Sequence, residues 1–500
     1  MESTRMSAAA IGQSPYSVVR PCRLHEVPRW DLEADVLVLG FGAAGACAAI
    51  EAARAGAGVC LFEATSGSGG TSALSGGEIY FGGNGGTPIQ NAAGFTDTTE
   101  DLAQYLIMAG GPNVDEARAR RYAENSLAHF HWLLEQGVRY KYSFIPERIV
   151  EPMTDDCLIW SGSEEAWPFS QQAKPCPRGH TPEFMGMGAG RYLMDVLAER
   201  VEQAGVEVHY NTRVIALIAD DSNQVHGLVY KHEGRIGYAR GRRGVILCAG
   251  GFVMNRELLS QNAPQLLRCS QPIGTVDDGS GIQLGQSVGG VAINMAEGFV
   301  TVPWYPPETL IKGIFINERG QRFINEDCYH GRVSAHILRQ QCDRIFLLLD
   351  QASYAEPLFG EHFRIGIGAA GETWTEVEHE LELPSGALTA TVELYNRHAE
   401  AGQDPQFHKA AKWLRPLVDP PFVALDLCVN YAAYTCFTLG GLHTRPSGEV
   451  LNAQGLPVSG LYAAGRTACG LPRWGEGYSS GLSLADATYF GREAGRAAAG

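Results

Sequence analysis

The hydrophobic positions of residues 35–64 follow the order of a strand, a turn, a helix and a second strand. Residues 36–39 form a short apolar run that is typical of a buried parallel strand. An alanine-rich segment follows, and its helical pattern ends at the small-residue stretch "AGAG". The next run, "VCLFE", indicates the second strand, with Glu63 at its end. The pattern therefore predicts a β–α–β unit near the start of the chain.

Three glycines stand between the first strand and the helix, in the spacing G-x-G-x-x-G. Gly40 permits a tight turn, Gly42 lets the backbone approach a pyrophosphate, and Gly45 lets helix and strand pack closely. The helix N-terminus offers N–H groups and a positive dipole end to phosphates. Glu63 has the position from which an acidic side chain binds ribose hydroxyls, and its charge disfavours the 2′-phosphate of NADP. The sequence predicts a dinucleotide site here.

Prolines mark two places farther along the chain where hinges or linkers are expected. One group lies at Pro303, Pro306 and Pro307, and the other lies at residues 416–421. A second glycine cluster, "MGMGAGRYLMDVL", follows no strand pattern. We therefore predict no second dinucleotide fold and no bound NAD(P).

The composition narrows the class of protein. Five hundred residues allow two or three domains, and 45% hydrophobic with 19% charged residues describe an ordinary globular protein. A formal charge of −16 argues against nucleic acid or an anionic membrane surface as partner. The longest apolar run is too short and too interrupted to span a bilayer, and the first thirty residues hold no signal-peptide core. Twelve cysteines without a CxxC pattern favour free thiols in the cytoplasm and no metal site.

The glycine-rich segment after Glu63, "GSGGTSALSGGEIYFGGNGG", distinguishes FAD from NAD. An NAD dehydrogenase continues here with another helix and strand. This segment resembles instead the flavin loop of the fumarate reductase and 3-ketosteroid dehydrogenase flavoproteins, with Gly69, Gly70, Thr71 and Ser72 matching the motif. Members that bind FAD covalently carry a histidine in this stretch, and this chain has none. The resemblance therefore implies non-covalent FAD.

Four later segments resemble the same family in the family's order. They are "GVEVHYNTRVIALIAD", "RGVILCAGGF", "TVDDGSGIQLGQSVGG" and "SGLYAAGRTACG". The resemblance implies an adenine contact at Val214, an acidic position at Asp278, and contacts of Gly465 and Arg466 with the pyrophosphate and ribityl region. The FAD-binding residues implied in all are Gly40, Gly42, Ala43, Ala44, Gly45, Glu63, Ala64, Gly69, Gly70, Thr71, Ser72, Gly76, Gly77, Val214, Ala249, Gly250, Gly251, Asp278, Gly465, Arg466, Ser480, Gly481, Ser483 and Leu484.

The fold that the resemblance implies is of the α/β (α+β) class. A Rossmann-like FAD-binding domain of the fumarate reductase flavoprotein type would comprise residues 33–296 and 428–500. A substrate-capping, catalytic domain would be inserted at residues 297–427, and residues 1–32 would form an N-terminal lead-in. Because clefts between domains commonly bind small ligands, we expect the substrate between these two parts.

Three positions of the resemblance decide the substrate class. Fumarate reductases hold a dicarboxylate with a histidine and an arginine and deliver a proton from another arginine. This chain has Phe437 and Tyr478 at the first two places, and Tyr329 with His330 at the third. Charge-assisted hydrogen bonds contribute about 1.5–3 kcal/mol each, so their loss disfavours a dicarboxylate. A tyrosine hydroxyl and a backbone N–H suit a neutral ketone, because their hydrogen bonds to its oxygen strengthen as an enolate forms.

Within the family, the flavin loop and the Y-x-S-G run at Tyr478, Ser480 and Gly481 most resemble the 3-ketosteroid Δ4-(5α)-dehydrogenases. The resemblance implies oxidation of a 3-oxo-5α-steroid to the Δ4-3-ketosteroid, with hydride passing from C5 to flavin N5 and a proton leaving C4. Tyr329 is the expected base, provided that its neighbours lower its pKa from about 10, and His330 is the alternative. Tyr478 or the Gly481 N–H would hold the carbonyl, with Ser480 as a relay.

Other interpretations remain open at this point. Ser480 could instead cap the helix that is expected to begin near Leu482. The activity could be that of a 3-ketosteroid Δ1-dehydrogenase, although the proline-rich tyrosine–glycine stretch of that group is absent. It could also be that of an enoate reductase acting on fumarate or urocanate, or the chain could bind flavin without catalysis. The electron acceptor stays unassigned.

Overall fold

The computed structural model describes residues 19–340 and 342–500, so most of the predicted lead-in at residues 1–32 lies outside the described residues. Its largest sheet has nine strands, in the order β1-β8-β9-β10-β2-β3-β7, with β21 pairing β10 and β20 pairing β21. These strands are β1 (Cys22–Arg23), β2 (Leu32–Leu39), β3 (Val59–Phe62), β7 (Glu207–His209), β8 (Thr212–Ala219), β9 (Val225–His232), β10 (Arg235–Leu247), β20 (Glu449–Leu451) and β21 (Pro457–Ala463).

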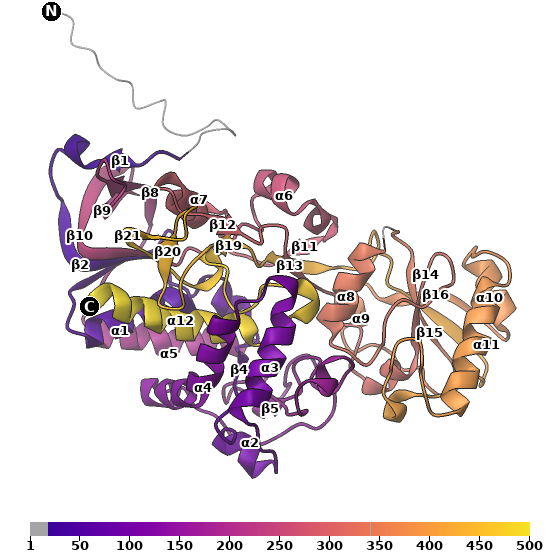
Figure 1. The fold of residues 1–500 in the computed structure, drawn as a ribbon. Coiled ribbons are helices and arrows are strands. Elements are labelled where there is room, and N and C mark those ends of the chain that lie inside the picture. The colour runs from indigo at the N-terminus through magenta and orange to yellow at the C-terminus, as the bar shows by residue number, and fades with distance from the viewer. Residues whose placement is uncertain (1–18, 341) are drawn as a thin grey trace, which may run out of the picture.

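The predicted β–α–β unit forms the centre of this sheet. β2 and β3 are parallel, with Val36 opposite Val59, and α1 (Ala43–Arg54) connects them. α12 (Leu482–Ala499) packs along α1 beneath the sheet (Figure 1). A Cβ at Gly495 would lie 2.2 Å from the carbonyl oxygen of Ala48, so the two helix backbones are in direct contact. The α/β fold with a Rossmann-like unit is confirmed.

A helical layer follows the glycine-rich loop. It holds α2 (Pro88–Ala92), α3 (Thr99–Gly110), α4 (Glu116–Gln136) and α5 (Ala189–Gln203). A small sheet, in the order β4-β6-β5, stands beside these helices and comprises β4 (Ile79–Tyr80), β6 (Gly179–His180) and β5 (Leu158–Ile159). Because β4 begins one residue after Glu78, this small sheet fixes where the glycine-rich loop ends.

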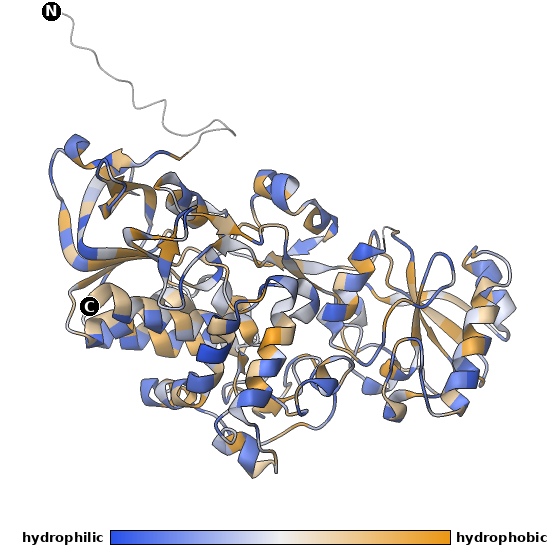
Figure 2. Cartoon of the chain, in the orientation of Figure 1, coloured by the Kyte–Doolittle hydropathy of each residue, from blue (hydrophilic) through white to orange (hydrophobic). Residues whose placement is uncertain are grey.

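A second lobe lies away from the large sheet, at the right of Figure 1. Its antiparallel sheet, in the order β14-β15-β17-β16, consists of β14 (Ile314–Asn317), β15 (Ile345–Leu349), β17 (Phe422–Asp426) and β16 (Gly366–Gly371). The apolar strands of both lobes stand out in orange in Figure 2. The lobe's helices are α8 (His330–Arg339), α9 (Gly360–Phe363), α10 (Trp374–Glu380) and α11 (Ala387–Glu400). All four strands fall within the predicted insertion at 297–427.

A narrow three-stranded sheet joins the two lobes. Its order is β11-β18-β13, with β11 (Gln271–Pro272), β18 (Thr435–Thr438) and β13 (Gly298–Thr301). β13 and β18 are antiparallel, and Phe299 lies opposite Phe437. α6 (Arg256–Asn262), α7 (Ser280–Ser287) and the pair β12 (Ala292–Ile293) with β19 (Gly441–Leu442) complete the fold. None of the helices in the described part of the chain combines the length and the apolar character of a membrane span.

Candidate active site

One cavity of about 650 Å³ extends from the glycine turn to the second lobe. Its wall includes the turn after β2, the glycine-rich loop, the joining sheet, the start of α8 and the segment before α12. Phe359, His362 and Phe363, at α9, line it from the side of the second lobe. This volume lies within the range of small-molecule and cofactor sites.

The nucleotide end of the cavity follows the predicted fingerprint. Gly40 has φ of +98°, and a Cβ there would lie 2.4 Å from the carbonyl oxygen of Cys248, so only glycine fits this turn. The Glu63 carboxylate accepts hydrogen bonds from the N–H groups of Phe41 and Thr65, both at 2.8 Å. These bonds hold the carboxylate at the cavity wall beside the start of α1.

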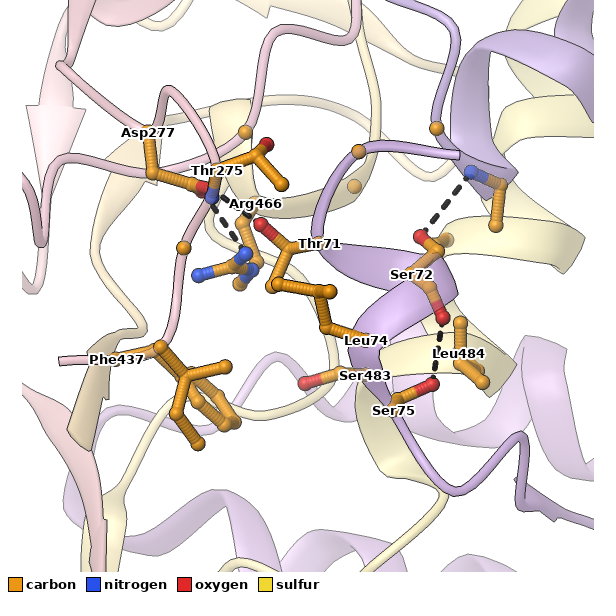
Figure 3. Close-up of a pocket in the computed structure, with 18 of the residues that line it drawn as sticks. Thr71, Ser72, Leu74, Ser75, Thr275, Asp277, Phe437, Arg466, Ser483 and Leu484 are labelled. Atoms are coloured by element: carbon orange, nitrogen blue, oxygen red, sulfur yellow. Dashed lines mark hydrogen bonds and ion pairs between the residues drawn. The ribbon is translucent and has the colours of Figure 1, made fainter. Parts of the chain in front are cut away.

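An ion pair forms the middle of the wall. Asp277 accepts hydrogen bonds from the Thr71 hydroxyl and from the Gly251 N–H at 2.9 Å. It also pairs with Arg466, at 2.9 Å between Oδ1 and Nη2, and the three side chains point toward one another in Figure 3. Nη1 of Arg466 is buried without a partner, and the guanidinium lies 5.1 Å from the ring centre of Phe437. An orphaned buried donor on a glycine-lined cavity fits a bound group with an acceptor oxygen, such as FAD.

Most of the predicted cofactor residues line this cavity. Those that do are Gly40, Gly42, Ala43, Ala44, Glu63, Ala64, Gly70, Thr71, Ser72, Gly76, Val214, Ala249, Gly250, Gly465, Arg466, Ser480, Gly481, Ser483 and Leu484. Gly45 instead packs on Gly40, and Gly77 packs on the start of α5. Gly69 and Gly251 also stand outside the lining residues.

The acidic position falls on Asp277 rather than on the predicted Asp278. Asp278 pairs with Arg213 and accepts a hydrogen bond from the Ser280 N–H at 3.0 Å, at the start of α7. Its carboxylate therefore serves that helix and not the cavity. The sequence "VDDG" offers two adjacent aspartates, and nothing in it distinguishes the one that turns inward.

The opposite end of the cavity brings together the predicted catalytic residues. The Tyr329 and Ser480 hydroxyls are 2.7 Å apart, and the Tyr478 hydroxyl donates to Ser483 Oγ at 3.0 Å. Phe299 lies against Tyr478, with 4.3 Å between ring centres, and both tyrosines are buried. Tyr329 stands at the N-terminal boundary of α8, where its N–H donates to Ser163 Oγ at 3.1 Å.

The segment before α12 is held by backbone contacts. The Ser480 N–H donates to the Ser161 carbonyl at 2.8 Å. Gly481 has φ of +94°, and a Cβ there would lie 2.8 Å from the Tyr80 nitrogen. α12 begins at Leu482 as expected, with Gly481 in the N-cap position and no side-chain cap. The alternative that Ser480 caps this helix is wrong, because its hydroxyl faces Tyr329.

The protonation of the phenols differs from the prediction. Burial raises the pKa of Tyr329 well above its ordinary value, and the charge of Tyr478 adds to the rise. Burial likewise raises the pKa of Tyr478 to about 12, although its hydrogen bonding with Ser483 acts in the opposite direction. A tyrosinate base at Tyr329 would need a lowered pKa. A phenol in this apolar wall keeps its proton near neutral pH, so Tyr329 can accept a proton only while passing its own onward.

The surroundings of His330 also shift its pKa from the ordinary value of a histidine. It stacks obliquely on Tyr329, with 4.1 Å between ring centres, and its Nδ1 lies 2.5 Å from Thr301 Oγ1. Nε2 is buried without a partner. Burial lowers the pKa of His330 to about 3. The imidazole is therefore neutral and weakly basic, so His330 is poorly suited to act as the base near neutral pH.

Two carboxyl groups that sequence reasoning missed also line this cavity. Glu78 comes from the end of the glycine-rich loop, and Glu151 comes from the loop before β5. Glu78 was visible in the sequence as an acidic residue in the flavin loop, "SGGEIY". No pattern in the sequence brings Glu151 to the same wall.

The cations of the cavity are already paired. Of the described residues that line it, the arginines are Arg213 and Arg466, which pair with Asp278 and Asp277. Apart from the carboxyl groups of Glu78 and Glu151, the wall around Tyr329 and Tyr478 is aromatic and hydroxylic. This end of the cavity therefore suits an uncharged polar group better than an anion.

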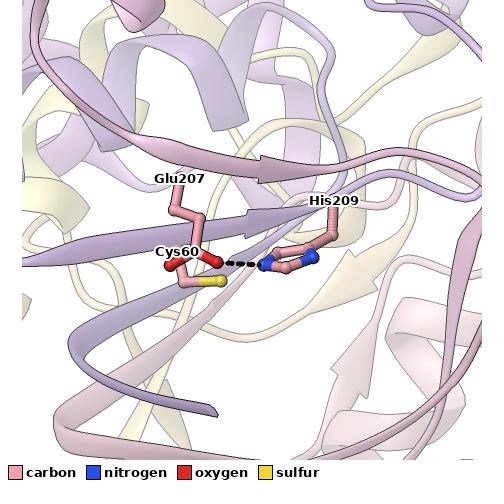
Figure 4. Close-up of side chains that lie close together, drawn as sticks. All are labelled: Cys60, Glu207 and His209. Atoms are coloured by element: carbon pink, nitrogen blue, oxygen red, sulfur yellow. Dashed lines mark hydrogen bonds and ion pairs between the residues drawn. The ribbon is translucent and has the colours of Figure 1, made fainter.

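A separate group of side chains lies at the edge of the large sheet. The ligand atoms of Cys60, Glu207 and His209 lie within 4.8 Å of one another, and Glu207 Oε1 is 2.9 Å from His209 Nε2 (Figure 4). Burial raises the pKa of the Cys60 thiol, which keeps it protonated and a poor metal ligand. The contact between Glu207 and His209 is therefore a hydrogen bond along β7, at the edge of the sheet, and not evidence of a metal site.

Comparisons with known proteins agree with this geometry. The sequence model of the family described as "FAD binding domain" matches residues 35–482. The chain is 42% identical to the crystal structure of 3-ketosteroid-Δ4-(5α)-dehydrogenase from Rhodococcus jostii RHA1 in complex with 4-androstene-3,17-dione. That match has a TM-score of 0.91 and covers 96% of this chain and 100% of the other.

Two curated relatives are more distant. The chain is 25% identical over 504 residues to the 3-oxo-5-alpha-steroid 4-dehydrogenase of Comamonas testosteroni, covering 87% of this chain and 93% of the relative. It is 28% identical over 484 residues to a fumarate reductase (cytochrome) of Shewanella frigidimarina, covering 93% of this chain and 77% of the relative.

Proposed function

We propose that this chain, which belongs to the FAD binding domain family, oxidises a saturated 3-oxo-5α-steroid to the Δ4-3-ketosteroid. It is an FAD-dependent oxidoreductase acting on a CH–CH group. The observation that carries the steroid assignment is the tyrosine end of the cavity. Two buried phenols and a serine hydroxyl stand among aromatic rings there, and both lining arginines are engaged by aspartates. Such a wall favours a neutral carbonyl on an apolar skeleton.

The residues that would hold FAD lie at the other end. Gly42 and Ala43, at the start of α1, suit the diphosphate, Glu63 suits a ribose, and Arg466 offers its free Nη1 to an acceptor oxygen. The glycine-rich loop holds no histidine, which supports non-covalent binding. FAD, when bound, supplies the acceptor for the hydride that leaves C5.

Tyr478 and Gly481 are proposed to hold the C3 carbonyl. Because its pKa is raised to about 12, Tyr478 keeps its proton at neutral pH and can donate it in a hydrogen bond. Turning from Ser483 to the substrate would place this donor on an oxygen whose negative charge grows as the enolate forms. The Gly481 N–H, at the same wall, would be the second donor.

Tyr329 and Ser480 are proposed to take the proton from C4. The 2.7 Å contact of their hydroxyls lets Tyr329 accept a proton on its oxygen while its own proton moves to Ser480. His330 would position the Tyr329 ring rather than act as the base, since its own pKa is lowered to about 3.

Residues 297–427 are proposed to cap the substrate. Phe359, His362 and Phe363 bring this part of the chain to the cavity that also holds the glycine turn. All twelve cysteines are free, and we further propose a cytoplasmic location on that basis.

Anaerobic mixing of the yellow holoenzyme with 5α-androstane-3,17-dione tests the function. We expect the flavin absorbance to bleach and 4-androstene-3,17-dione to form in equal amount. Fumarate and urocanate, offered to the dye-reduced enzyme, are the comparison substrates. Failure of the steroid to bleach the flavin, together with rapid turnover of either acid, would overturn the proposal.

A further inference from the structure

The cavity wall next to the tyrosines carries two carboxyl groups that the proposed reaction does not yet use. Glu78 is 7% exposed, and its Oε1 is buried without a hydrogen-bond partner. Glu151 is partly buried and accepts one hydrogen bond, from the Gly188 N–H at 3.2 Å before α5. A buried, unpartnered carboxyl oxygen facing a cavity requires an explanation, because leaving it unbonded is costly.

The two carboxyl groups interact with each other across the glycine-rich loop. A Cβ at Gly76 would lie 2.6 Å from the carboxyl carbon of Glu151, so Glu151 packs on the loop two residues before Glu78. Burial raises the pKa of Glu78 well above its usual range, and the negative charge of Glu151 raises it further. Burial also raises the pKa of Glu151, against the hydrogen bond from Gly188. Two carboxyl groups that share a poorly solvated wall do not both ionise easily, so we expect the pair to retain one proton.

No described cation neutralises this pair. The other charged groups that line the same cavity are Glu63, Asp277, Arg213 and Arg466, and each has a partner other than Glu78 or Glu151. The other titratable groups that line it are Tyr329, Tyr478, His330, His362 and Cys248. The pair is therefore a site whose protonation can change during turnover, not half of a structural salt bridge.

Glu78 lies on the tyrosine side of the pair. The Tyr80 N–H donates to the Gly481 carbonyl at 3.3 Å, and a Cβ at Gly481 would lie 3.0 Å from the Ile79 carbonyl carbon. The strand that begins one residue after Glu78 is thus packed on the segment that carries Ser480. When ionised, Glu78 would also raise the pKa of Tyr329 and of Tyr478, so the carboxyl lies within electrostatic reach of both phenols.

Glu151 lies on the outer side. Leu74 and Met187 line the cavity with it, and both are exposed, at 58% and 43%. A proton held by Glu151 is therefore close to solvent, whereas Tyr329 is buried among aromatic rings.

We propose that Glu78 and Glu151 form the route by which the substrate proton leaves the active site. The inference rests on the proposed function. As the C4–H bond breaks, its electron pair enters the new C4=C5 double bond, and hydride leaves C5 for the acceptor that bound FAD would supply. The proton goes to the Tyr329 oxygen, the phenol proton passes to Ser480, and the Ser480 proton passes to the Glu78–Glu151 pair, directly or through one water. Glu151 then releases it to solvent.

Stopped-flow mixing of the anaerobic holoenzyme with 5α-androstane-3,17-dione tests this route. Flavin bleaching and proton release to a pH-indicator dye are recorded together, in H₂O and in D₂O. The variants are Glu78→Gln, Glu78→Asp and Glu151→Gln. Glu147→Gln is the matched control, because Glu147 is an exposed carboxyl on the Glu151 loop that does not line the cavity. Infrared spectra of the resting holoenzymes report the carboxylic-acid C=O band.

We expect Glu78→Gln to slow bleaching by about tenfold to a hundredfold, with a larger solvent isotope effect, and Glu78→Asp to recover part of the rate. In Glu151→Gln, proton release should lag behind bleaching, whereas the two coincide in the wild type and in Glu147→Gln. The carboxylic-acid band should disappear in Glu78→Gln.

If Glu78→Gln and Glu151→Gln both bleach and release protons at the same rates as the wild type, the proposed route is wrong, while the proposed function stands. If the wild type itself is not bleached by the steroid, the proposed function fails instead. In that case an infrared band unchanged by Glu78→Gln would also overturn the shared proton, since that readout needs no turnover.

Discussion

Replacing Tyr478 by phenylalanine isolates the hydroxyl that we assign to the substrate carbonyl. The ring stays, so its contact with Phe299 at 4.3 Å is kept, and only the bond to Ser483 Oγ is lost. One neutral hydrogen bond contributes about 1 kcal/mol to folding, so the free energy of unfolding should fall by no more than that. Removing one donor to a developing oxyanion costs about 2.7–4 kcal/mol, so kcat/KM should fall by about 10²–10³-fold.

The assay is steady-state oxidation of 5α-androstane-3,17-dione with an artificial acceptor, beside thermal unfolding and binding of 4-androstene-3,17-dione. Product affinity should fall much less than kcat/KM, because the donor strengthens only as charge develops. Tyr140→Phe is the matched control, since Tyr140 has a buried hydroxyl without a partner and does not line the cavity. Equal kcat/KM in Tyr478→Phe and wild type, with both folded, would refute the carbonyl assignment.

Three further changes test neighbouring features. Ser480→Ala should lower the rate of flavin bleaching by at least tenfold and leave the melting temperature nearly unchanged, because Ser480 bonds Tyr329 rather than capping α12. Gly481→Ala should destabilise the holoenzyme by more than about 1 kcal/mol in denaturant titration, since φ is +94° and the new Cβ would meet Tyr80. His330 has a pKa lowered to about 3, so the unfolded chain binds its proton first and stability falls as pH drops below about 6.5. His330→Gln should reduce the pH dependence of the free energy of unfolding by up to about 1.4 kcal/mol per pH unit between about pH 6 and pH 4. An unchanged slope would contradict the claim that burial keeps His330 neutral.

The sequence was sufficient for features that repeat at short range. The β–α–β unit follows from apolar periodicity and glycine spacing, and the contact of Gly40 with Cys248 shows the steric reason for that spacing. Tyr329, Tyr478 and Ser480 were located by their resemblance to family motifs, and the fold brings all three to one cavity. Their roles stay a prediction.

Features that depend on burial were beyond the sequence. The choice of Asp277 over Asp278 depends on which carboxylate turns inward after residue 276, and adjacent identical residues carry no signal of direction. The raised pKa of Tyr329 depends first on its burial, and the aromatic residues around it, Phe299 and Tyr478, come from other segments of the chain. Glu151 reaches the wall because its loop packs on Gly76, a contact between residues 75 positions apart in the chain.

The pairing of β13 with β18 constrains how the second lobe can move. The chain leaves for that lobe along one of these strands and returns along the other, and four residue pairs from Gly298–Thr438 to Thr301–Thr435 tie the two crossings into one ribbon. Because the two linkers are hydrogen-bonded to each other, they should bend together. The second lobe should therefore rotate about one hinge axis, without twisting or sliding. Because Phe299 and Phe437 are opposite each other on this ribbon and line the cavity, such a rotation would move the aromatic wall of the cavity. Admission of a rigid ligand and the fit of its ring plane would then be governed by a single mechanical coordinate.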